Sequence, residues 1–289
     1  MISTAAAVGI LILAHGGDPA WNAEIEKLRV AVSSAAPAAL ALGMADPETL
    51  QQGVDALEGQ HVSEIIVVPL FVNSNSEVMD QTRYALGLTE SPSEVLRAAE
   101  ERMKTMPMPP GMAHHHMHLF SLKRVSHRAK IALAPALDAD PFVSSVLLDR
   151  ARALSHEPAK ETVILVAHGP VADAAVKDWE TDLAAHARAM IKEGGFRGAQ
   201  TALLRDDAAP EVRANAVAEL RAKVKAAGAD GGRALVVPVL ISRGGIEDKI
   251  PRDLAGLTFA WSGDALLPHS GFDLWVLERA EVIHRPSAR

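Results

Sequence analysis

Two histidines stand where an apolar run stops and a glycine follows. They are His15 in "LILAHGG" (11–17) and His168 in "VILVAHGP" (163–170). An imidazole changes charge near neutral pH, so it can accept a proton or ligate a divalent metal. The glycines let the chain turn sharply without a Cβ clash. This pattern predicts a histidine at the carboxyl end of a buried strand, where open parallel sheets bind ligands. A turn-capping role is the alternative for any single histidine of this kind.

A second group of polar residues follows the apolar run "IIVVPLFV" (65–72). The chain continues as "NSNSEVMDQTRYALG" and offers Asn73, Asn75 and Glu77, with Arg83 about two helical turns further on. If a helix starts here, Glu77 lies in its first turn. A neutral histidine and one carboxylate make a weak, open site for a divalent ion. Ordinary loop and helix-capping chemistry is the competing interpretation.

Apolar runs of strand length alternate with longer amphipathic segments along the chain, which is typical of an α/β fold with a parallel sheet. The expected strands are 8–14, 65–72, 131–137, 162–167 and 234–241, with weaker ones near 200–204 and 257–261. The expected helices are 20–34, 47–57, 141–154, 173–192 and 210–226.

The order of features in the first half recurs in the second. "ILAHGG" matches "LVAHGP", "ADPETLQQGVDAL" matches "AAPEVRANAVAEL", and "IIVVPLFV" matches "ALVVPVLI". Four matched elements in one order indicate an internal duplication, the fourth being "LAPALDADPFVSSVLLDRA" with "LLPHSGFDLWVLERA". We therefore expect two similar doubly wound parallel-sheet domains with flavodoxin-type strand order, 1–157 and 158–289, which meet near 156–161.

Composition narrows the function further. The 289 residues carry a net charge of −7 without a basic stripe, which argues against a nucleic-acid partner. The chain has no cysteine, so disulfides and thiolate metal sites are excluded. It has no long apolar span and no charged leader before the first strand, so we expect a cytoplasmic protein without membrane contact. Phosphate-binding loops and the G-x-G-x-x-G pattern are absent, which leaves nucleotide binding unsupported.

Taken together, these residues resemble the class II tetrapyrrole chelatases, and in particular the long, duplicated form of the CbiX-like sirohydrochlorin chelatases. The resemblance covers about the whole chain and is carried by "LAHGG", "VVPLFV" with its loop, "APALDADPFVSSVLLDRA" and "ALLPHSGFDLWVLERA". It implies a lyase that inserts cobalt, nickel or iron into sirohydrochlorin or a related tetrapyrrole, in cofactor biosynthesis of the cobalamin or siroheme type. The metal is then a substrate, and no tightly bound cofactor is expected.

The resemblance also implies site residues. His15 takes the role of metal ligand and proton acceptor. The family often has a second histidine eight residues after the proline of the third strand, and here that position is Glu77. A His–Glu pair resembles the related protoporphyrin ferrochelatases, and Asn75 is the alternative second ligand. Gly16, Asn73 and Arg83 are expected to contact the tetrapyrrole.

The second half lacks this partner, because the eighth residue after Pro238 is Ile246. We therefore expect one active site, in the first half. An insert at about 103–124 has no counterpart in the second half and contains "MAHHHMH". Its His114, His115, His116 and His118 are candidate accessory metal ligands, since short histidine-rich tracts bind metals. A metal- or tetrapyrrole-binding protein without catalysis is the alternative function, and another α/β enzyme, such as a phosphoesterase, is a second.

Overall fold

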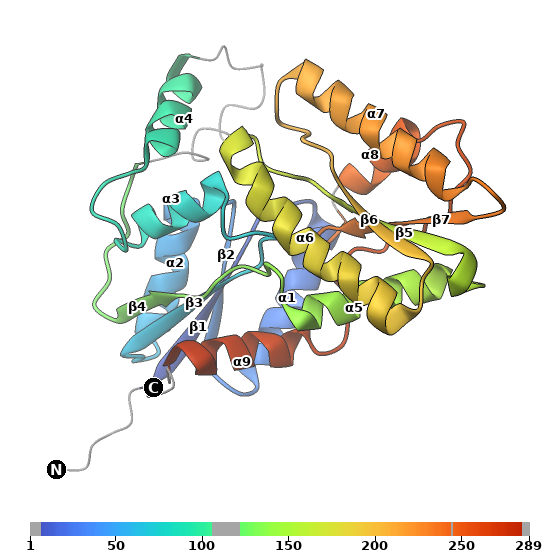
Figure 1. The fold of residues 1–289 in the computed structure, drawn as a ribbon. Helices are drawn as coiled ribbons and strands as arrows, with labels where there is room; N and C mark the ends of the chain where they lie inside the picture. The colour runs from blue at the N-terminus through green and yellow to red at the C-terminus, as the bar shows by residue number, and fades with distance from the viewer. Residues whose placement is uncertain (1–6, 106–121, 244, 285–289) are drawn as a thin grey trace, which may run out of the picture. The chain divides into compact units, whose positions relative to one another are not determined.

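The structure is a computed structural model that describes residues 7–105, 122–243 and 245–284 (Figure 1). The chain forms two compact units. The first contains Met1–Ala136 and Ser270–Arg289, and the second contains Leu137–His269. Each unit is a parallel β-sheet with helices on both faces, so the predicted α/β fold is confirmed.

The first sheet has four parallel strands in the order β2-β1-β3-β4. Their bounds are Val8–Ala14 for β1, Ala38–Leu42 for β2, Glu64–Pro69 for β3 and Lys130–Leu133 for β4. β1 and β3 are almost entirely buried, as expected for apolar strands covered on both faces. This strand order is that of flavodoxin-like doubly wound sheets, which bind ligands beyond the carboxyl ends of the strands.

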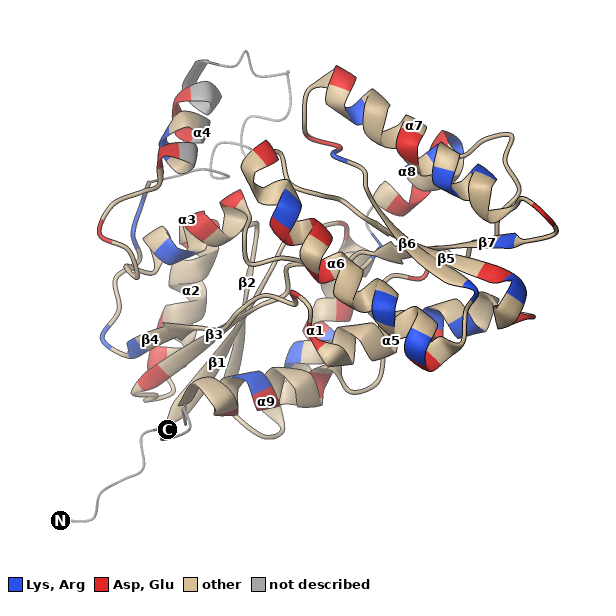
Figure 2. Cartoon of the chain, viewed as in Figure 1, with Lys and Arg blue, Asp and Glu red and all other residues tan. Residues whose placement is uncertain are grey.

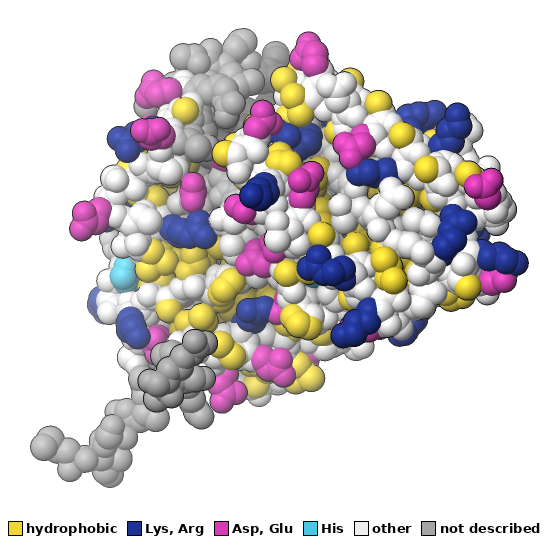
Figure 3. All heavy atoms as spheres, viewed as in Figure 1, with side chains coloured by type: hydrophobic (Ala, Val, Ile, Leu, Met, Phe, Trp, Pro, Cys, Tyr) yellow, Lys and Arg dark blue, Asp and Glu magenta, His cyan; other side chains and the backbone are white. Residues whose placement is uncertain are grey.

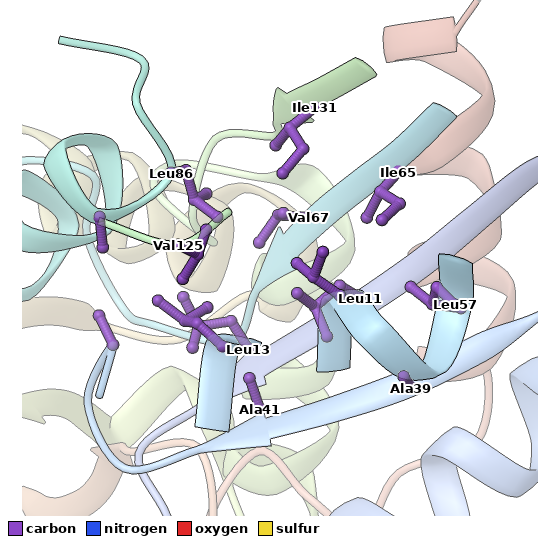
Figure 4. Close-up of a cluster of buried hydrophobic side chains, with 14 of the residues drawn as sticks. Leu11, Leu13, Ala39, Ala41, Leu57, Ile65, Val67, Leu86, Val125 and Ile131 are labelled. Carbon is purple, nitrogen blue, oxygen red and sulfur yellow. The ribbon is translucent and has the colours of Figure 1, made fainter. Parts of the chain in front are cut away.

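Helices cover both faces of this sheet. The bounds are Pro19–Ser33 for α1, Pro47–Glu58 for α2, Glu77–Ala85 for α3, Glu94–Thr105 for α4 and Phe272–His284 for α9. Side chains from α2 and α3 pack on Leu11 and Leu13 of β1 and Val67 of β3 in one core (Figure 4). Side chains alternate between the faces of a strand, so Ile10 and Ile12 point to the other face, where α1 packs with α9.

The second sheet has three parallel strands in the order β6-β5-β7. They are β5 (Glu161–Ala167), β6 (Gly198–Leu203) and β7 (Arg233–Val239), and the expected strand near 257–261 is a single bridge between Leu235 and Ala260. The helices of this unit are α5 (Pro141–Leu154), α6 (Asp173–Gly194), α7 (Pro210–Ala227) and α8 (Ile246–Asp253). α5 packs on α6 and β7, while α7 and α8 bury the other face of the sheet.

The two sheets confirm the internal duplication. β1 lies between β2 and β3, and β5 lies between β6 and β7, so the strand order is the same in both sheets. His15 comes directly after β1, and His168 comes directly after β5. The units do not divide where the chain was expected to divide. α5 belongs to the second unit although it precedes 157, and α9 belongs to the first although it is the last helix described. The helix that ends each half thus packs on the sheet of the other half.

Other differences from the sequence prediction are local. The strand expected at 131–137 ends at Leu133, so β4 has only four residues. Its continuation leaves the sheet, and Ala136 donates its backbone N–H to the hydroxyl of Ser74 at 2.9 Å. The strand β2 and the helices α4, α8 and α9 were absent from the prediction. β2 reads "AALAL", and alanine is a poor strand signal, while α8 contains Pro251 in its interior.

Charged residues lie along the helices and at the ends of the strands (Figure 2). On the face drawn in Figure 3, basic and acidic side chains are interspersed rather than gathered by sign. Among the residues that the structure describes, no helix has the length and apolar character needed to cross a membrane.

Candidate functional site

His15 is exposed at the turn that follows β1, and the turn is held by local bonds. Gly16 has φ of +79°, a conformation that favours glycine, and a Cβ there would lie 3.2 Å from the backbone nitrogen of Gly43. The backbone N–H of Gly17 donates to the side chain of Asn22 at 2.9 Å, and the Asn22 amide donates back to the Gly17 carbonyl at 3.0 Å. Asp18 then caps α1. The turn therefore presents its histidine from a fixed backbone.

The ring orientation of His15 fixes its tautomer. Nδ1 lies 2.6 Å from the carbonyl oxygen of Gly16. A carbonyl can only accept, so Nδ1 carries the hydrogen, and a neutral ring then has its lone pair on Nε2. No described residue bonds Nε2, and the ring packs edge-on against Trp21 with centroids 6.5 Å apart. The imidazole is thus oriented with the nitrogen that binds a proton or a metal left available.

The loop after β3 is fixed as firmly. Asn73 is buried, and its side-chain oxygen accepts the backbone N–H of Asn75 at 2.8 Å. The hydroxyl of Ser76 donates to the carbonyl of Asn73 at 3.2 Å. Glu77 is the first residue of α3, as predicted, and is half-buried. Its carboxylate makes no hydrogen bond or ion pair with another described residue, whereas Asn75 is exposed at the turn of the loop.

Arg83 braces this loop. Its guanidinium donates to the carbonyl of Ser74 at 3.0 Å and pairs with Asp80 at 3.0 Å. Because both contacts lie within the loop and the helix that follows it, they give Arg83 a positioning role. The predicted contact of Arg83 with a tetrapyrrole stays a prediction.

The sheet brings His15 and the Asn73–Glu77 loop to one edge. β1 and β3 are parallel neighbours in which Leu13 pairs with Pro69, so both segments leave the sheet at its carboxyl edge. No direct bond joins His15 and Glu77. Among the described residues, no three His, Asp or Glu side chains gather closely enough to hold a metal ion. The chemistry available at this edge is one oriented imidazole and one half-buried carboxylate.

The second half repeats the turn and changes the partner. Nδ1 of His168 lies 2.8 Å from the carbonyl of Gly169, whose φ of +80° matches that of Gly16. Nε2, however, lies 3.1 Å from the carboxylate of Asp207. Burial of His168 opposes its protonation, but the hydrogen bonds to Asp207 and Gly169 and the charges of Asp207 and Asp206 outweigh burial and raise its pKa. Both ring nitrogens therefore face acceptors, and this arrangement favours the imidazolium, which has no lone pair to offer.

Asp207 comes from the loop after β6, which charged contacts hold in place. The neighbouring Asp206 is nearly buried and pairs with Lys249 at 2.6 Å and with Arg213. Burial raises the pKa of Asp206, but its hydrogen bonds to these two cations outweigh burial and lower it. Arg213 in turn pairs with Asp253 at 2.5 Å. This network fixes the backbone next to Asp207.

The other predicted position in the second half agrees with the sequence. Ile246 begins α8 just as Glu77 begins α3, and it packs against the apolar core of this unit. Glu247, one residue further on, accepts the backbone N–H of Gly245 at 3.0 Å.

The sequence did not reveal the residues that contact the two histidines. Asp207 and Trp21 each contact a histidine of interest, and a search of both loops next to the central strand would have found Asp207. The histidine-rich insert, with His114, His115, His116 and His118, lies outside the described residues.

Comparison with known proteins follows from this geometry. The CbiX family model matches residues 9–154. SirB from Bacillus subtilis with Fe³⁺ is similar in fold, with a TM-score of 0.61 at 16% identity over 96% of this chain and 95% of that one. SirB from Bacillus subtilis subspecies spizizenii in complex with cobalt gives 0.59 at 13% identity over 96% of both chains. CbiX, the terminal enzyme for biosynthesis of siroheme in denitrifying bacteria, gives 0.55 at 20% identity over 97% of this chain and all of that one.

These structural likenesses, at such low identities, establish the chelatase-like fold. No protein among those with curated functions matches the sequence. The family match spans the strands and loops that carry His15 and Glu77 and extends through half of the chain. The chain belongs to the CbiX family.

Proposed function

We propose that this protein is a metal chelatase that inserts a divalent cation into sirohydrochlorin or a closely related tetrapyrrole. The observation that carries the proposal is the His15 turn, in which the Gly16 carbonyl orients the ring and leaves Nε2 available at the carboxyl edge of the first sheet. Family membership supports the same activity. The products are the metallated ring and two protons, so the reaction needs a base and a metal site that releases its ion.

His15 serves as that base and as the first metal ligand. A neutral imidazole accepts a pyrrole proton near neutral pH when Nε2 is within hydrogen-bond reach of it. Because proton uptake removes the lone pair, a ring that takes a proton also lets go of a metal ion. Base and ligand are therefore successive states of one nitrogen.

Glu77 is the proposed second ligand. A carboxylate at the start of α3 that bonds no other described residue can hold a hydrated cation without first breaking an internal contact. Two protein ligands also leave most positions of the ion open, which favours its transfer to four ring nitrogens. Asn75 is the alternative second ligand, and Gly16, Asn73 and Arg83 are proposed to line the tetrapyrrole side of the site.

Cobalt, nickel and iron all remain candidate substrates. Imidazole with carboxylate suits each of these ions, and affinity alone does not select among them. The solved SirB structures contain Fe³⁺ and cobalt, which supports iron and cobalt as candidate substrates of this chain. The product would then feed cofactor biosynthesis of the siroheme or cobalamin type.

The test is a chelatase assay of the purified chain with sirohydrochlorin and Co²⁺, Ni²⁺ or Fe²⁺ in turn, followed by absorbance. Each rate is compared with the uncatalysed rate for the same ion. We expect acceleration with at least one ion. Tight binding of sirohydrochlorin or metal without acceleration for any of the three would instead support a binding protein without catalysis.

A further inference from the structure

Trp21 packs against the turn that presents His15, and no step of the proposed reaction has used it. It is the third residue of α1 and the first of the buried side chains on this helix, which continue with Ile25, Leu28 and Val32. The residue is only 6% exposed. Its backbone N–H donates to the carboxylate of Asp18 at 2.8 Å, so the helix cap fixes the point from which the indole extends.

The indole contacts both the imidazole and the backbone of the turn. The rings of His15 and Trp21 meet at 62° with centroids 6.5 Å apart, which is the edge-to-face arrangement that aromatic pairs favour. A Cβ on Gly17 would lie 3.1 Å from Cγ of the indole, so the glycine lets the turn approach the ring closely. The indole is therefore a fixed surface against which the imidazole packs.

Asn22, the next residue of the helix, holds the backbone of the same turn. Its side chain accepts the N–H of Gly17 at 2.9 Å and donates to the carbonyl of Gly17 at 3.0 Å. These bonds fix the main chain but do not touch the imidazole. An exposed side chain holds one rotamer only where neighbouring groups restrict it. For His15 those groups are the carbonyl of Gly16 and the indole of Trp21.

The second copy of the turn lacks both helical residues. Counted from the first residue of α1 and of α6, Trp21 corresponds to Ala175 and Asn22 corresponds to Val176. Alanine has no ring and valine has no amide, so neither can make the contact of its counterpart. The tryptophan and the asparagine thus accompany the histidine whose Nε2 bonds no described residue.

Polar contacts take their place in the second copy. Arg205 donates to the carbonyl of Val171 at 2.7 Å and pairs with Asp173 at 2.7 Å, which holds the backbone after His168. Asp207 holds the ring of His168 through Nε2 at 3.1 Å. That arrangement orients an imidazole by occupying one of its nitrogens, whereas an aromatic neighbour orients the ring and leaves Nε2 available.

We propose that Trp21 is a positioning residue for metal capture, whose indole holds the His15 ring with Nδ1 on the Gly16 carbonyl and Nε2 available to the ion. A ring that is already held binds an ion without first losing its rotational freedom, so the indole should strengthen metal binding. The proposal rests on the proposed function for the reaction that follows. The orientation of the ring is a property of the free protein and can be measured without a tetrapyrrole.

The first measurement is of the ring itself. Nitrogen NMR of the full chain, about two pH units above the usual histidine pKa, shows which ring nitrogen carries the hydrogen, and the spectrum of His15→Ala identifies the signals of His15. We expect the hydrogen on Nδ1 in the unaltered chain. Trp21→Leu keeps an apolar side chain but removes the ring, so it should give a mixture of the two tautomers. Trp21→Phe restores an aromatic ring and should recover most of the Nδ1 form.

The second measurement is a titration with Co²⁺ alone, followed by the broadening of the His15 ring signals, so that the other histidines of the chain do not contribute. Trp21→Leu should weaken binding about tenfold, the upper end of the cost of immobilising one side chain. Trp21→Phe should weaken it less. Trp179→Leu is the matched control, because Trp179 is also 6% exposed and lies in α6 of the second unit. It should leave the tautomer and the binding of Co²⁺ unchanged.

Unchanged tautomer and Co²⁺ binding in Trp21→Leu would overturn the proposal, and so would an equal loss in the Trp179→Leu control. Thermal unfolding of each variant shows whether the fold is kept. Two observations need no variant: a hydrogen on Nε2 of His15 in the unaltered chain, or the absence of a nuclear Overhauser contact between the two rings, would also overturn it.

Failure of this proposal can be told from failure of the proposed function. If the unaltered chain does not accelerate metal insertion but its tautomer and Co²⁺ binding depend on Trp21, the chelatase activity is removed and the positioning role stands. Acceleration by the unaltered chain, with a normal tautomer and normal Co²⁺ binding in Trp21→Leu, would do the reverse.

Discussion

His15 and His168 occupy equivalent turns and differ at one nitrogen. Both rings donate from Nδ1 to the carbonyl of the following glycine, at 2.6 and 2.8 Å. Nε2 of His15 bonds no described residue, whereas Nε2 of His168 faces Asp207. The backbone turn is the same in both copies, but in the second copy a carboxylate from a neighbouring loop pairs with Nε2 and favours the protonated ring. A repeated motif therefore preserves geometry without preserving chemistry.

The loops after β3 and β7 differ in a complementary way. The first carries Glu77 and uses Arg83 to hold itself together. The second has Ile246 at the matching position, packed against the core of its unit. The first copy carries the carboxylate that we propose as a metal ligand, whereas the second has an apolar residue at the same position.

The strongest test of this contrast exchanges alanine for each histidine in turn. We expect His15→Ala to lower the chelatase rate at least about 100-fold, the usual cost of losing a general base. His168→Ala should cost far less, because Nε2 of its ring is already paired with Asp207. Steady-state rates at saturating metal and tetrapyrrole measure both. If His168→Ala stops turnover and His15→Ala does not, the active site lies in the other half.

Glu77 tests whether the first half supplies the second ligand. Glu77→Gln keeps the shape of the side chain but removes its charge, so the KM for metal should rise about tenfold or more, as expected when a charged contact is lost. The KM for the tetrapyrrole should change little. Glu77→His restores the pair common in the family and should keep activity with an altered preference among the three metals. Glu94→Gln, at the exposed first turn of α4, is the control for loss of a carboxylate. A normal metal KM in Glu77→Gln would transfer the role to Asn75.

A substitution at Asp207 tests whether this carboxylate holds His168 in its protonated form. In Asp207→Asn the carboxylate that favours the imidazolium is gone while burial remains, so the pKa of His168 should fall. NMR titration of the ring protons measures this, and the chelatase rate should stay unchanged. A histidine pKa that is raised in the folded state stabilises the fold below about pH 6.5, the usual histidine pKa in the unfolded chain. This stabilisation is lost as the pH rises through the folded-state pKa. The unfolding free energies of the two proteins should therefore differ most in acid and converge in base. A difference that grows with pH would show that Asp207 acts in another way.

The smallest expected effect concerns the insert, which only the first half carries. If its histidines gather metal for the site, deleting residues 103–118 should raise the metal concentration needed for half-maximal rate and leave the rate at saturating metal nearly intact. Replacing His114, His115, His116 and His118 by Ser in the full-length insert separates the histidines from the length of the segment. Loss of activity at every metal concentration would place the insert in the active site itself.

The sequence predicted the strands and helices that have a clear local signal. β1, β3, β5 and β7 are continuous apolar runs, and the helices that begin at Pro47, Pro141 and Pro210 start where proline predicts a first helical turn. Glu77 could be placed at the start of a helix because it follows a strand and a run of Asn and Ser. These features depend on local sequence alone.

Features that depend on tertiary contacts could not be predicted from the sequence. The pairing of His168 with Asp207 joins loops from two strands whose neighbourhood is known only once the sheet is formed. The exchange of α5 and α9 was hidden for the same reason, because each helix has the amphipathic pattern that either sheet could accept.

The exchanged helices also set an order of assembly during synthesis. The second unit is one continuous stretch, Leu137–His269, whereas the first needs α9, which is made after all of it. His284 on α9 lies 2.7 Å from Glu64 of β3, although 220 positions separate them in the chain. Domains fold as units while they emerge from the ribosome. The second unit can therefore fold completely while the face of the first sheet that α9 covers is still exposed. The copy proposed to carry the chemistry is thus the last to close.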